Sequence, residues 1–105
     1  MNFFDLKQKR WTQGPLLNNC RDSHSSCCLG QYVYVFAGDE NGSIESLQVE
    51  GGKAWQVLAE LTLLNRRLNP AVAVLNERAI AVFGGFYYEQ QINSGIVFDT
   101  EQKTC

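Results

Sequence analysis

The apolar residues of this chain fall into short runs, and polar or turn-forming residues separate one run from the next. The runs, which are rich in Val, Ile, aromatic residues and Cys, cover 24–29, 32–37, 43–49, 54–58, 70–75, 79–83 and 92–98. Such runs, bounded by Gly, Asn, Asp or charged residues, are typical of β-strands. The pattern therefore predicts an all-β chain in which successive strands pair as antiparallel hairpins.

Two details of the pattern refine this prediction. Gly30-Gln31 separates two runs and has the length and composition of a two-residue hairpin turn. In the run that follows, Tyr32, Tyr34 and Phe36 alternate with two valines and an alanine. Because alternate strand residues point to opposite faces, both faces of this strand are apolar. We therefore expect it to be buried on both sides.

The chain also contains an internal repeat. Residues 21–38 align with residues 67–85, with an offset of 46 at Arg21 and Arg67 and of 47 at Gly38 and Gly85. The extra residue falls in the polar turn 76–78, where an insertion is tolerated. A fixed period of this length indicates a repeat architecture in which each repeat is one structural unit.

A second set of landmarks gives a similar period. Trp11 and Trp55 are 44 residues apart, and Cys105 follows Trp55 by 50. Each of the three stands six residues after a strand end, at Asp5, Val49 and Asp99 respectively.

The repeat also bears on the stretch 55–67, where leucines at helical spacing would fit an amphipathic helix. The equivalent stretch after Trp11 contains Gly14-Pro15, which a helix interior excludes, so we expect no helix there.

Four short antiparallel strands per repeat are typical of a β-propeller blade. The repeated residues resemble the kelch family, whose pattern has an aliphatic second strand, a glycine pair, an acidic strand end and a tryptophan six residues later. The glycine pair is Gly84-Gly85 in one copy and Ala37-Gly38 in the other. The tryptophan is Trp11 and Trp55, with Cys105 in the third copy. The resemblance covers the whole chain, and its specificity lies in the recurrence of several individually weak motifs.

The resemblance implies kelch-type propeller blades, each a four-stranded antiparallel meander, over residues 1–105. Residues 1–13 would end one blade with strands at 2–5 and 10–13, residues 21–58 a complete blade, and residues 67–105 a second, incomplete blade. Propellers close with about four to eight blades, so we expect an incomplete propeller that is either part of a longer protein or assembles with copies of itself. Alone, this chain is expected to self-associate or aggregate, because an open blade leaves apolar surface and a sheet edge exposed.

The motif residues carry structural expectations of their own. Ala37 indicates that the first position of the glycine pair tolerates a Cβ, whereas Gly38 and Gly85 are expected to resist replacement. Trp11 and Trp55 are expected to bridge neighbouring blades, since aromatic side chains offer a large area to bury.

Composition and charge argue against several classes of protein. The chain has 105 residues, of which 45% are apolar, and a formal net charge of −2. This balance gives no electrostatic reason to expect nucleic acid or an anionic membrane as a partner. The sequence has no apolar run long enough to span a bilayer. The first seven residues include an acid and a lysine where a secretion signal needs apolar residues, so we expect a cytoplasmic protein.

The cysteines raise the question of a metal site. Cys20, His24, Cys27 and Cys28 lie within nine residues of one another. Adjacent strand residues point to opposite faces, however, so Cys27 and Cys28 are poorly placed to share one metal ion. We therefore expect structural thiols, with no metal and no cofactor.

The candidate binding site follows from the predicted topology. In a four-stranded meander the loops after the second and fourth strands lie at the same end of the sheet, and together they would form a rim that contacts partners. The candidate partner-binding residues on this rim are Arg21, Asp39, Glu40, Asn41, Arg66, Arg67, Tyr87, Tyr88, Glu89 and Gln90. The segment 86–91 is the most suggestive, because aromatic residues beside polar ones favour interfaces.

Structural alternatives stand beside this interpretation. Arg21 and Arg67 recur at the same repeat position, which favours capping carbonyls or pairing with an acid in the neighbouring blade. Tyr87 and Tyr88 could instead pack against the next blade.

The sequence contains no nucleophile motif, phosphate-binding loop or paired-carboxylate constellation. We therefore predict a non-enzymatic protein-interaction module, such as a scaffold or adaptor, a substrate receptor for a ubiquitin ligase, or a cytoskeletal binder. Some kelch-like propellers are copper enzymes that resemble galactose oxidase, with a tyrosine, cysteine and histidine set drawn from several blades. The alternative is accordingly a fragment of a propeller enzyme whose catalytic residues lie outside this chain, because His24 is its one histidine.

Overall fold

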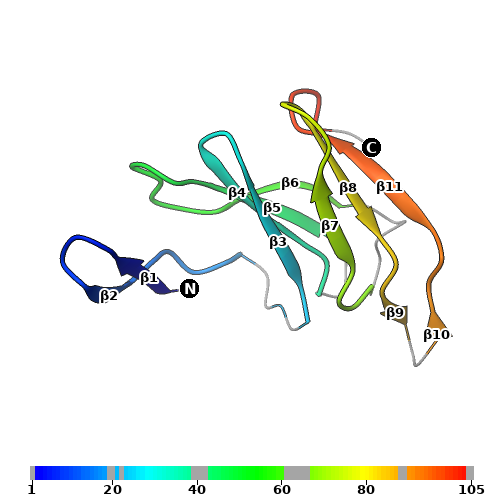
Figure 1. Ribbon diagram of the computed structural model, residues 1–105, viewed down its shortest axis with the longest axis horizontal. Coiled ribbons are helices and arrows are strands. Elements are labelled where there is room, and N and C mark those ends of the chain that lie inside the picture. Colours follow the sequence, from blue (N-terminus) through cyan, green and yellow to red (C-terminus); the bar gives the residue numbers. More distant parts are fainter. Residues whose placement is uncertain are drawn as a thin grey trace.

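The computed structural model describes residues 2–18, 21, 23–38, 43–60, 67–87 and 90–103, and its regular structure is entirely β (Figure 1). The all-β prediction is therefore confirmed, and the described residues contain no helix and so none that could span a membrane. The strands are β1 (Asn2–Asp5), β2 (Arg10–Gln13), β3 (Ser25–Leu29), β4 (Tyr32–Phe36), β5 (Ser43–Gln48), β6 (Gln56–Glu60), β7 (Ala71–Val74), β8 (Ala79–Phe83), β9 (Phe86–Tyr87), β10 (Gln90–Gln91) and β11 (Gly95–Asp99).

The first large sheet is a four-stranded antiparallel meander in the order β3-β4-β5-β6. Its strands lie within two residues of the predicted runs at every end, and β3 and β4 are joined by the expected two-residue turn. Gly30 in this turn has a φ of 63°, a left-handed conformation that glycine adopts without strain. The sequence signals for the first repeat therefore match the strands that form.

The second large sheet is three-stranded, in the order β11-β8-β7, and it repeats the register of the first. The repeat offsets of 46 and 47 carry the β3–β4 pair onto the β7–β8 pair, and the β4–β5 pair corresponds to the β8–β11 pair after a further shift of four residues along the last strand. Equivalent pairs are Ser25–Phe36 with Ala71–Phe83, and Val35–Glu45 with Val82–Ile96. The extra residue of the second repeat is absorbed in the turn between β7 and β8, as its polar composition predicted.

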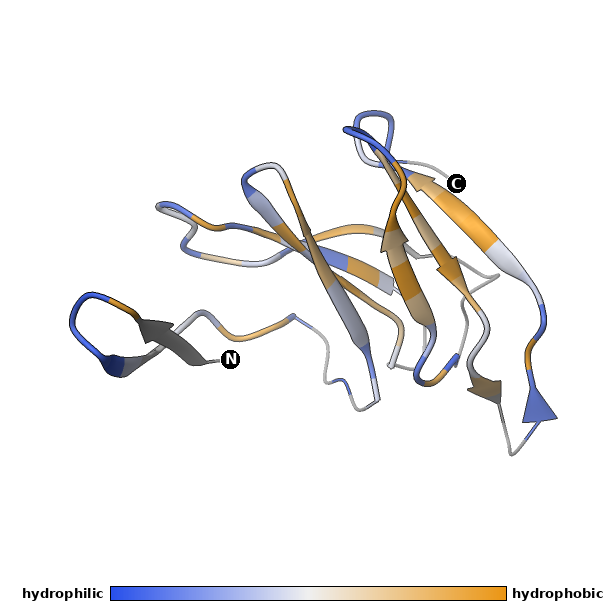
Figure 2. Ribbon diagram, viewed as in Figure 1, coloured by the Kyte–Doolittle hydropathy of each residue, from blue (hydrophilic) through white to orange (hydrophobic). Residues whose placement is uncertain are grey.

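Apolar side chains between these two sheets form the larger core. Its buried members are Tyr34, Phe36, Ile44, Ile80, Val82 and Phe98. The Phe98 ring packs edge-on against two rings of the first sheet, with centroids 6.3 Å from Tyr34 and 6.1 Å from Phe36. Figure 2 shows that the strands of the C-terminal sheet are hydrophobic and that the turns at their ends are hydrophilic.

The other face of the first sheet is also covered. Val35, Leu47 and Trp55 form a second buried cluster, against which Leu17 and Val33 pack. The expectation that β4 is buried on both faces is therefore confirmed, because its alternating side chains enter different clusters.

Equivalent residues of the two sheets face in the same direction. Val35 and its equivalent Val82 both lie on the N-terminal side of their sheets, since Val35 packs toward Leu17 and Val82 toward the first sheet. Phe36 and its equivalent Phe83 take the opposite faces, as neighbours in a strand must. Phe36 is covered by the second sheet, whereas Phe83 is 48% exposed. One face of the second sheet is therefore open where the equivalent face of the first is covered.

The two tryptophans differ in their surroundings. Trp55 is 3% exposed and its indole N–H donates a hydrogen bond of 3.1 Å to the carbonyl of Pro15. Trp11 lies in the separate β1–β2 hairpin, at the left in Figure 1, and is 68% exposed. Trp55 is therefore buried between the first sheet and the segment that precedes it, whereas the Trp11 side chain is exposed.

The short hairpin of β9 and β10 was not predicted. Its strands lie at 86–87 and 90–91, within a segment that was expected to be a rim loop. The segment lacks the Gly or Asn-Gly pair that usually marks a tight turn, while its aromatic residues favour extended backbone. The last strand, β11, begins at Gly95 and not at the predicted Ile92, whose N–H donates a hydrogen bond of 2.9 Å to the Gly85 carbonyl.

Candidate interaction surface at one end of the sheets

Backbone hydrogen bonds bring the loop regions of the two repeats together at one end of the sheets. The Gly38 N–H donates to the Arg67 carbonyl at 3.3 Å, and the Asn69 N–H donates to the Ser23 carbonyl at 2.7 Å. Ser23 and Asn69 are equivalent positions, and both have left-handed φ values, of 60° and 51°. The chain segments after the second strands and before the first strands therefore meet in one region.

The exposed centre of this region is a pair of apolar residues. Leu68 and Phe86 form an antiparallel bridge, in which the Leu68 N–H donates to the Phe86 carbonyl at 2.8 Å and the reverse bond is 2.9 Å. Gln91 of β10 pairs with Phe86 of β9, so the bridge extends into the short hairpin. A small set of backbone hydrogen bonds thus supports this surface.

We call this the Leu68–Phe86 surface and define it as Leu68, Asn69, Phe86, Gln90 and Gln91. All five are exposed, with 38% exposure at Leu68 and 43% at Phe86. The surface therefore combines apolar area with amide side chains and carries no formal charge, a composition suited to protein contacts.

Sequence reasoning found part of this surface. Gln90 was a predicted binding residue and Phe86 lay in the suggestive segment 86–91. Leu68 was missed, although an apolar residue between Arg67 and Asn69-Pro70 in an otherwise polar connection was an available signal.

Most of the other predicted rim residues lie outside the described part of the chain. Tyr87 belongs to β9, but only its backbone is described. The other predicted positions, which lie outside the described residues, are Asp39, Glu40, Asn41, Arg66, Tyr88 and Glu89.

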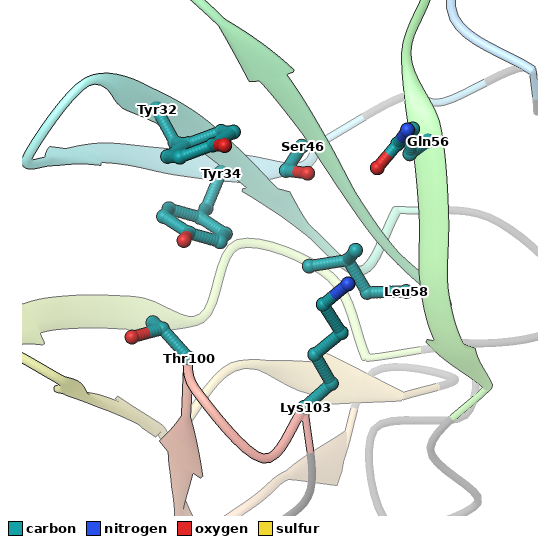
Figure 3. Close-up of a pocket in the computed structure, with 7 residues that line it drawn as sticks. All are labelled: Tyr32, Tyr34, Ser46, Gln56, Leu58, Thr100 and Lys103. Carbon is teal, nitrogen blue, oxygen red and sulfur yellow. The ribbon is translucent and has the colours of Figure 1, made fainter.

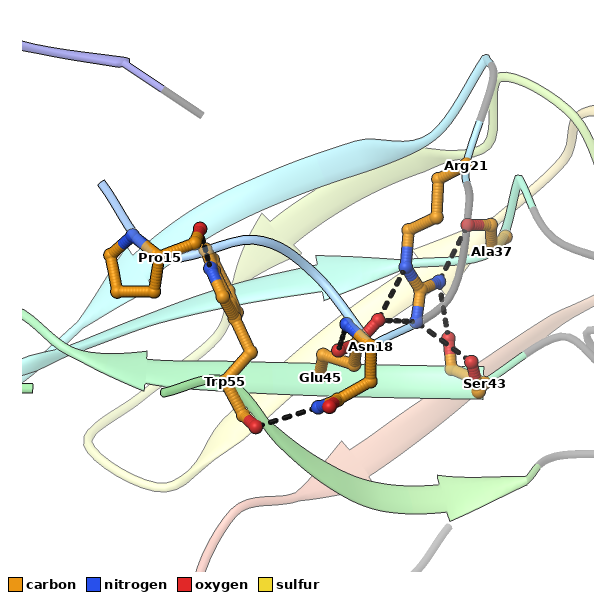
Figure 4. Close-up of polar contacts among 7 residues, drawn as sticks. All are labelled: Pro15, Asn18, Arg21, Ala37, Ser43, Glu45 and Trp55. Carbon is orange, nitrogen blue, oxygen red and sulfur yellow. Dashed lines mark hydrogen bonds and ion pairs between the residues drawn. The ribbon is translucent and has the colours of Figure 1, made fainter. Parts of the chain in front are cut away.

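Arg21 is buried at the base of the loop that follows β4. Its guanidinium donates to the Ala37 carbonyl at 2.7 Å, and to the carbonyl and hydroxyl of Ser43 at 2.9 and 2.7 Å (Figure 4). It also contacts the Glu45 carboxylate at 2.8 and 3.0 Å, and both of these side chains are 0% exposed. The arginine therefore ties the end of β4 to the start of β5.

Glu45 has a second donor on its other oxygen. The Asn18 N–H donates to Glu45 Oε1 at 2.7 Å, and the Asn18 side-chain amide donates to the Trp55 carbonyl at 2.6 Å. The segment that precedes the first sheet is thereby fastened across β5 and β6. A buried carboxylate needs this number of donors to offset its desolvation.

Arg67 has the equivalent place in the second repeat. It is 3% exposed, and its guanidinium donates to the carbonyl and hydroxyl of Ser94 at 2.9 and 3.2 Å. Ser94 and Ser43 are equivalent by register, because they stand two residues before the equivalent residues Ile96 and Glu45. Ile96 stands where the first repeat has Glu45. Burial of the Arg67 guanidinium lowers its pKa from the usual value.

These contacts favour the structural alternative for the two arginines. Arg21 and Arg67 were candidate partner-binding residues, and the structure places both side chains in buried positions at the bases of the loops. Both cap backbone carbonyls, as the alternative held, and the acid that pairs with Arg21 is Glu45 of its own sheet and not an acid of the neighbouring one. Both arginines therefore fix the bases of the loops at this end.

The glycine pair behaves as the repeat implied. A Cβ on Gly84 would meet only the Ile92 carbonyl oxygen, at 3.8 Å, and its equivalent Ala37 already has a left-handed φ of 61°. A Cβ on Gly85 would lie 2.6 Å from the Leu68 carbonyl oxygen, and Gly85 has a φ of 103°. Gly85 is therefore required for the close approach that forms the Leu68–Phe86 bridge.

Cys27 and Cys28 point to opposite faces of β3. Cys27 is half-buried against the core between the sheets, and Cys28 is exposed. Burial, with a smaller contribution from Cys28, raises the pKa of Cys27 to about 11. Within the ranges that the structure describes, which exclude Cys20, no group of three or more potential metal ligands occurs.

Comparison with known proteins gives no independent assignment. Neither a protein-family model nor a curated protein matches this sequence.

Proposed function

We propose that this chain is part of a kelch-type β-propeller that binds a protein partner through the Leu68–Phe86 surface. The observation that carries the proposal is the exposed apolar pair itself, held by two backbone hydrogen bonds at the end where the loops of both repeats meet. In this role the protein acts as a scaffold or adaptor and not as an enzyme.

The arrangement of the two sheets supports the propeller part of the proposal. Equivalent residues face the same way in both sheets, as they do when blades follow one another around an axis. β3 and β7, the first strands of the two repeats, are also the strands of different sheets that approach most closely. The Ser25 hydroxyl on β3 donates a hydrogen bond to the Pro70 carbonyl just before β7. First strands lying innermost are what blades radiating from an axis require.

The chemistry of the surface supports the binding part. Leu68 and Phe86 offer apolar area that would be desolvated by contact, while the side chains of Asn69, Gln90 and Gln91 can donate and accept hydrogen bonds around it. Interfaces commonly place an apolar centre within a polar rim, and the centre carries most of the binding energy. A partner with an apolar anchor and uncharged hydrogen-bonding groups fits this surface.

The proposal is tested by comparing two serine variants as bait for cellular proteins. Phe86→Ser removes the apolar centre, whereas Leu75→Ser alters another exposed apolar residue, in the β7–β8 turn at the opposite end. We expect the same identified proteins with the unaltered chain and Leu75→Ser, and at least about tenfold less of them with Phe86→Ser. Equal recovery with all three baits would refute the assignment of the surface.

A further inference from the structure

A second site lies at the opposite end of the sheets from the Leu68–Phe86 surface. A pocket of about 130 Å³ opens there between the first sheet and the turn that follows β11. Tyr32 and Tyr34 of β4 and Leu58 of β6 form an apolar wall (Figure 3). The site is distinct from the loop bases that Arg21 and Arg67 hold.

The remaining lining is polar and includes one cation. Ser46 of β5 and Gln56 of β6 contribute a hydroxyl and an amide, and Thr100 lies at the edge formed by the turn. Lys103 reaches from this turn across the pocket toward Leu58 (Figure 3). Among the seven residues that line the pocket none is acidic, so its charge is positive.

The turn that presents Lys103 is fixed by Asp99. One carboxylate oxygen accepts hydrogen bonds from the N–H groups of Glu101 and Gln102, at 2.9 and 3.1 Å. The other accepts from Arg78 at 2.6 Å, and this hydrogen bond holds the pKa of Asp99 below its usual value. Arg78 also pairs with Glu101 at 3.3 Å. The acids beside the pocket are thus engaged with Arg78, and no ion pair formed by the described residues involves Lys103.

Size and charge together define what the pocket can hold. A volume of about 130 Å³ equals roughly four water molecules in the liquid and is well below the few hundred Å³ of a drug-sized ligand site. This volume is close to that of one amino-acid side chain. A single ammonium beside neutral donors suits a singly charged carboxylate better than a phosphate, which favours arginine forks or several backbone N–H groups.

We propose that this pocket binds a glutamate side chain from an acidic segment of a protein partner. The carboxylate accepts hydrogen bonds from Lys103, Ser46 and Gln56, and its methylene groups lie against Leu58 and the tyrosine rings. The inference rests on the proposed function, since it supplies a second contact for a protein partner and defines the chemistry of that contact.

The test uses the full 105-residue chain and a defined probe, so it needs no identified partner. N-acetyl-glutamate methylamide is titrated against the ¹⁵N-labelled protein, and the amide signals of Ser46, Thr100 and Lys103 are followed. We expect saturable shifts confined to the pocket. Its neutral isostere, N-acetyl-glutamine methylamide, should cause shifts at least about tenfold weaker, as expected when a charge-assisted hydrogen bond is lost.

A matched pair of lysine variants shows whether the charge of Lys103 is responsible. Lys103 and Lys9 are both exposed turn residues with left-handed φ values, of 57° and 54°. Lys103→Met should weaken binding of the glutamate probe about tenfold or more, whereas Lys9→Met should leave it unchanged. Unaltered signals from β4 and β8 in each variant confirm that the fold is retained.

The outcomes separate the two proposals. Absent or unsaturable shifts, equal binding of the two probes, or unchanged binding by Lys103→Met would overturn the pocket proposal. Free glutarate binding more tightly than the peptide probe would also overturn it, in favour of a small-molecule ligand. None of these results changes the recovery of partner proteins in the Phe86→Ser bait experiment. Conversely, failure of that bait experiment leaves the titration with the glutamate probe unchanged.

Discussion

The guanidinium of Arg21 and the carboxylate of Glu45 form an ion pair with an Nη2–Oε2 distance of 2.8 Å, and both side chains are fully buried. A buried pair is costly to break, since removing one partner leaves an uncompensated charge in the interior. Arg21 also holds the backbone on both sides of the loop between β4 and β5. The pair is therefore a structural support for the end of the molecule that we assign to partner binding.

Breaking this pair alone should destabilise the protein more than replacing it. We expect Glu45→Leu to lower the free energy of unfolding by about 3–5 kcal/mol, and the double variant Arg21→Met with Glu45→Leu to recover part of that loss. Urea denaturation followed by circular dichroism measures both. Additive losses in the double variant would show that the two residues are not coupled.

The glycine pair predicts an asymmetric response to alanine. Gly84→Ala should cost only about 1–2 kcal/mol, the usual penalty of a left-handed residue, because space for its Cβ exists. Gly85→Ala should cost more, about 2–5 kcal/mol, because the added Cβ would also collide with the Leu68 backbone. Thermal unfolding of the two variants side by side gives the comparison. Equal losses would contradict the close approach at Gly85.

The pKa of about 11 at Cys27 predicts slow alkylation. At pH 8 this thiol should carry on the order of a hundredfold less thiolate than an ordinary cysteine, and its iodoacetamide rate should rise about tenfold per pH unit up to about 11. Cys28→Ser leaves Cys27 as the only cysteine of the tryptic peptide 22–53, so mass spectrometry reads it directly.

The same shift has a consequence for stability. The thiol ionises in the unfolded chain near its ordinary pKa but in the folded chain only near 11. Its contribution to stability is therefore complete at neutral pH and is lost as the pH rises from about 8.5 toward 11. A rate at Cys27 that matches that of a free thiol at pH 8 would contradict its burial.

The open face of the second sheet predicts self-association. Phe83 and Val97 are 48% and 50% exposed on the face of the second sheet that is equivalent to the Phe36 face of the first sheet. We expect sedimentation velocity to show association that increases with concentration, reduced in a Phe83→Ser, Val97→Ser double variant but not in Val49→Ser. A sharp monomer peak for the unaltered chain, with cooperative melting, would oppose this prediction.

The strands of both repeats were predictable because local signals agreed with the repeat. In β4, alternation of aromatic and aliphatic residues predicted burial on both faces, and Gly30-Gln31 predicted the turn before it. The β9–β10 hairpin was missed because its turn lacks such a signal. Phe86 of this hairpin also pairs with Leu68, which is 18 residues away in the sequence, and no local signal indicates that contact.

The candidate site was less predictable than the fold. Recurrence of Arg21 and Arg67 gave their equivalence, but it could not tell whether the side chains point outward or into the sheets. In the structure both side chains point into the sheets. The carbonyl and hydroxyl groups of Ser43 accept hydrogen bonds from Arg21, and those of Ser94 accept from Arg67. The pocket at Lys103 could not be predicted, since it combines residues of the first sheet with residues of the turn after β11, and no motif links the two.

The most direct test of the account is site-specific photo-crosslinking with p-benzoylphenylalanine, which resembles phenylalanine and reacts with whatever lies against it. The photoreactive residue is placed at Phe86 in one form of the protein and at Leu75 in another, and each is irradiated with cellular proteins. The account predicts that one defined set of proteins crosslinks at position 86 and not at position 75. Crosslinks of equal yield and identity at both positions, or none at position 86, would contradict it.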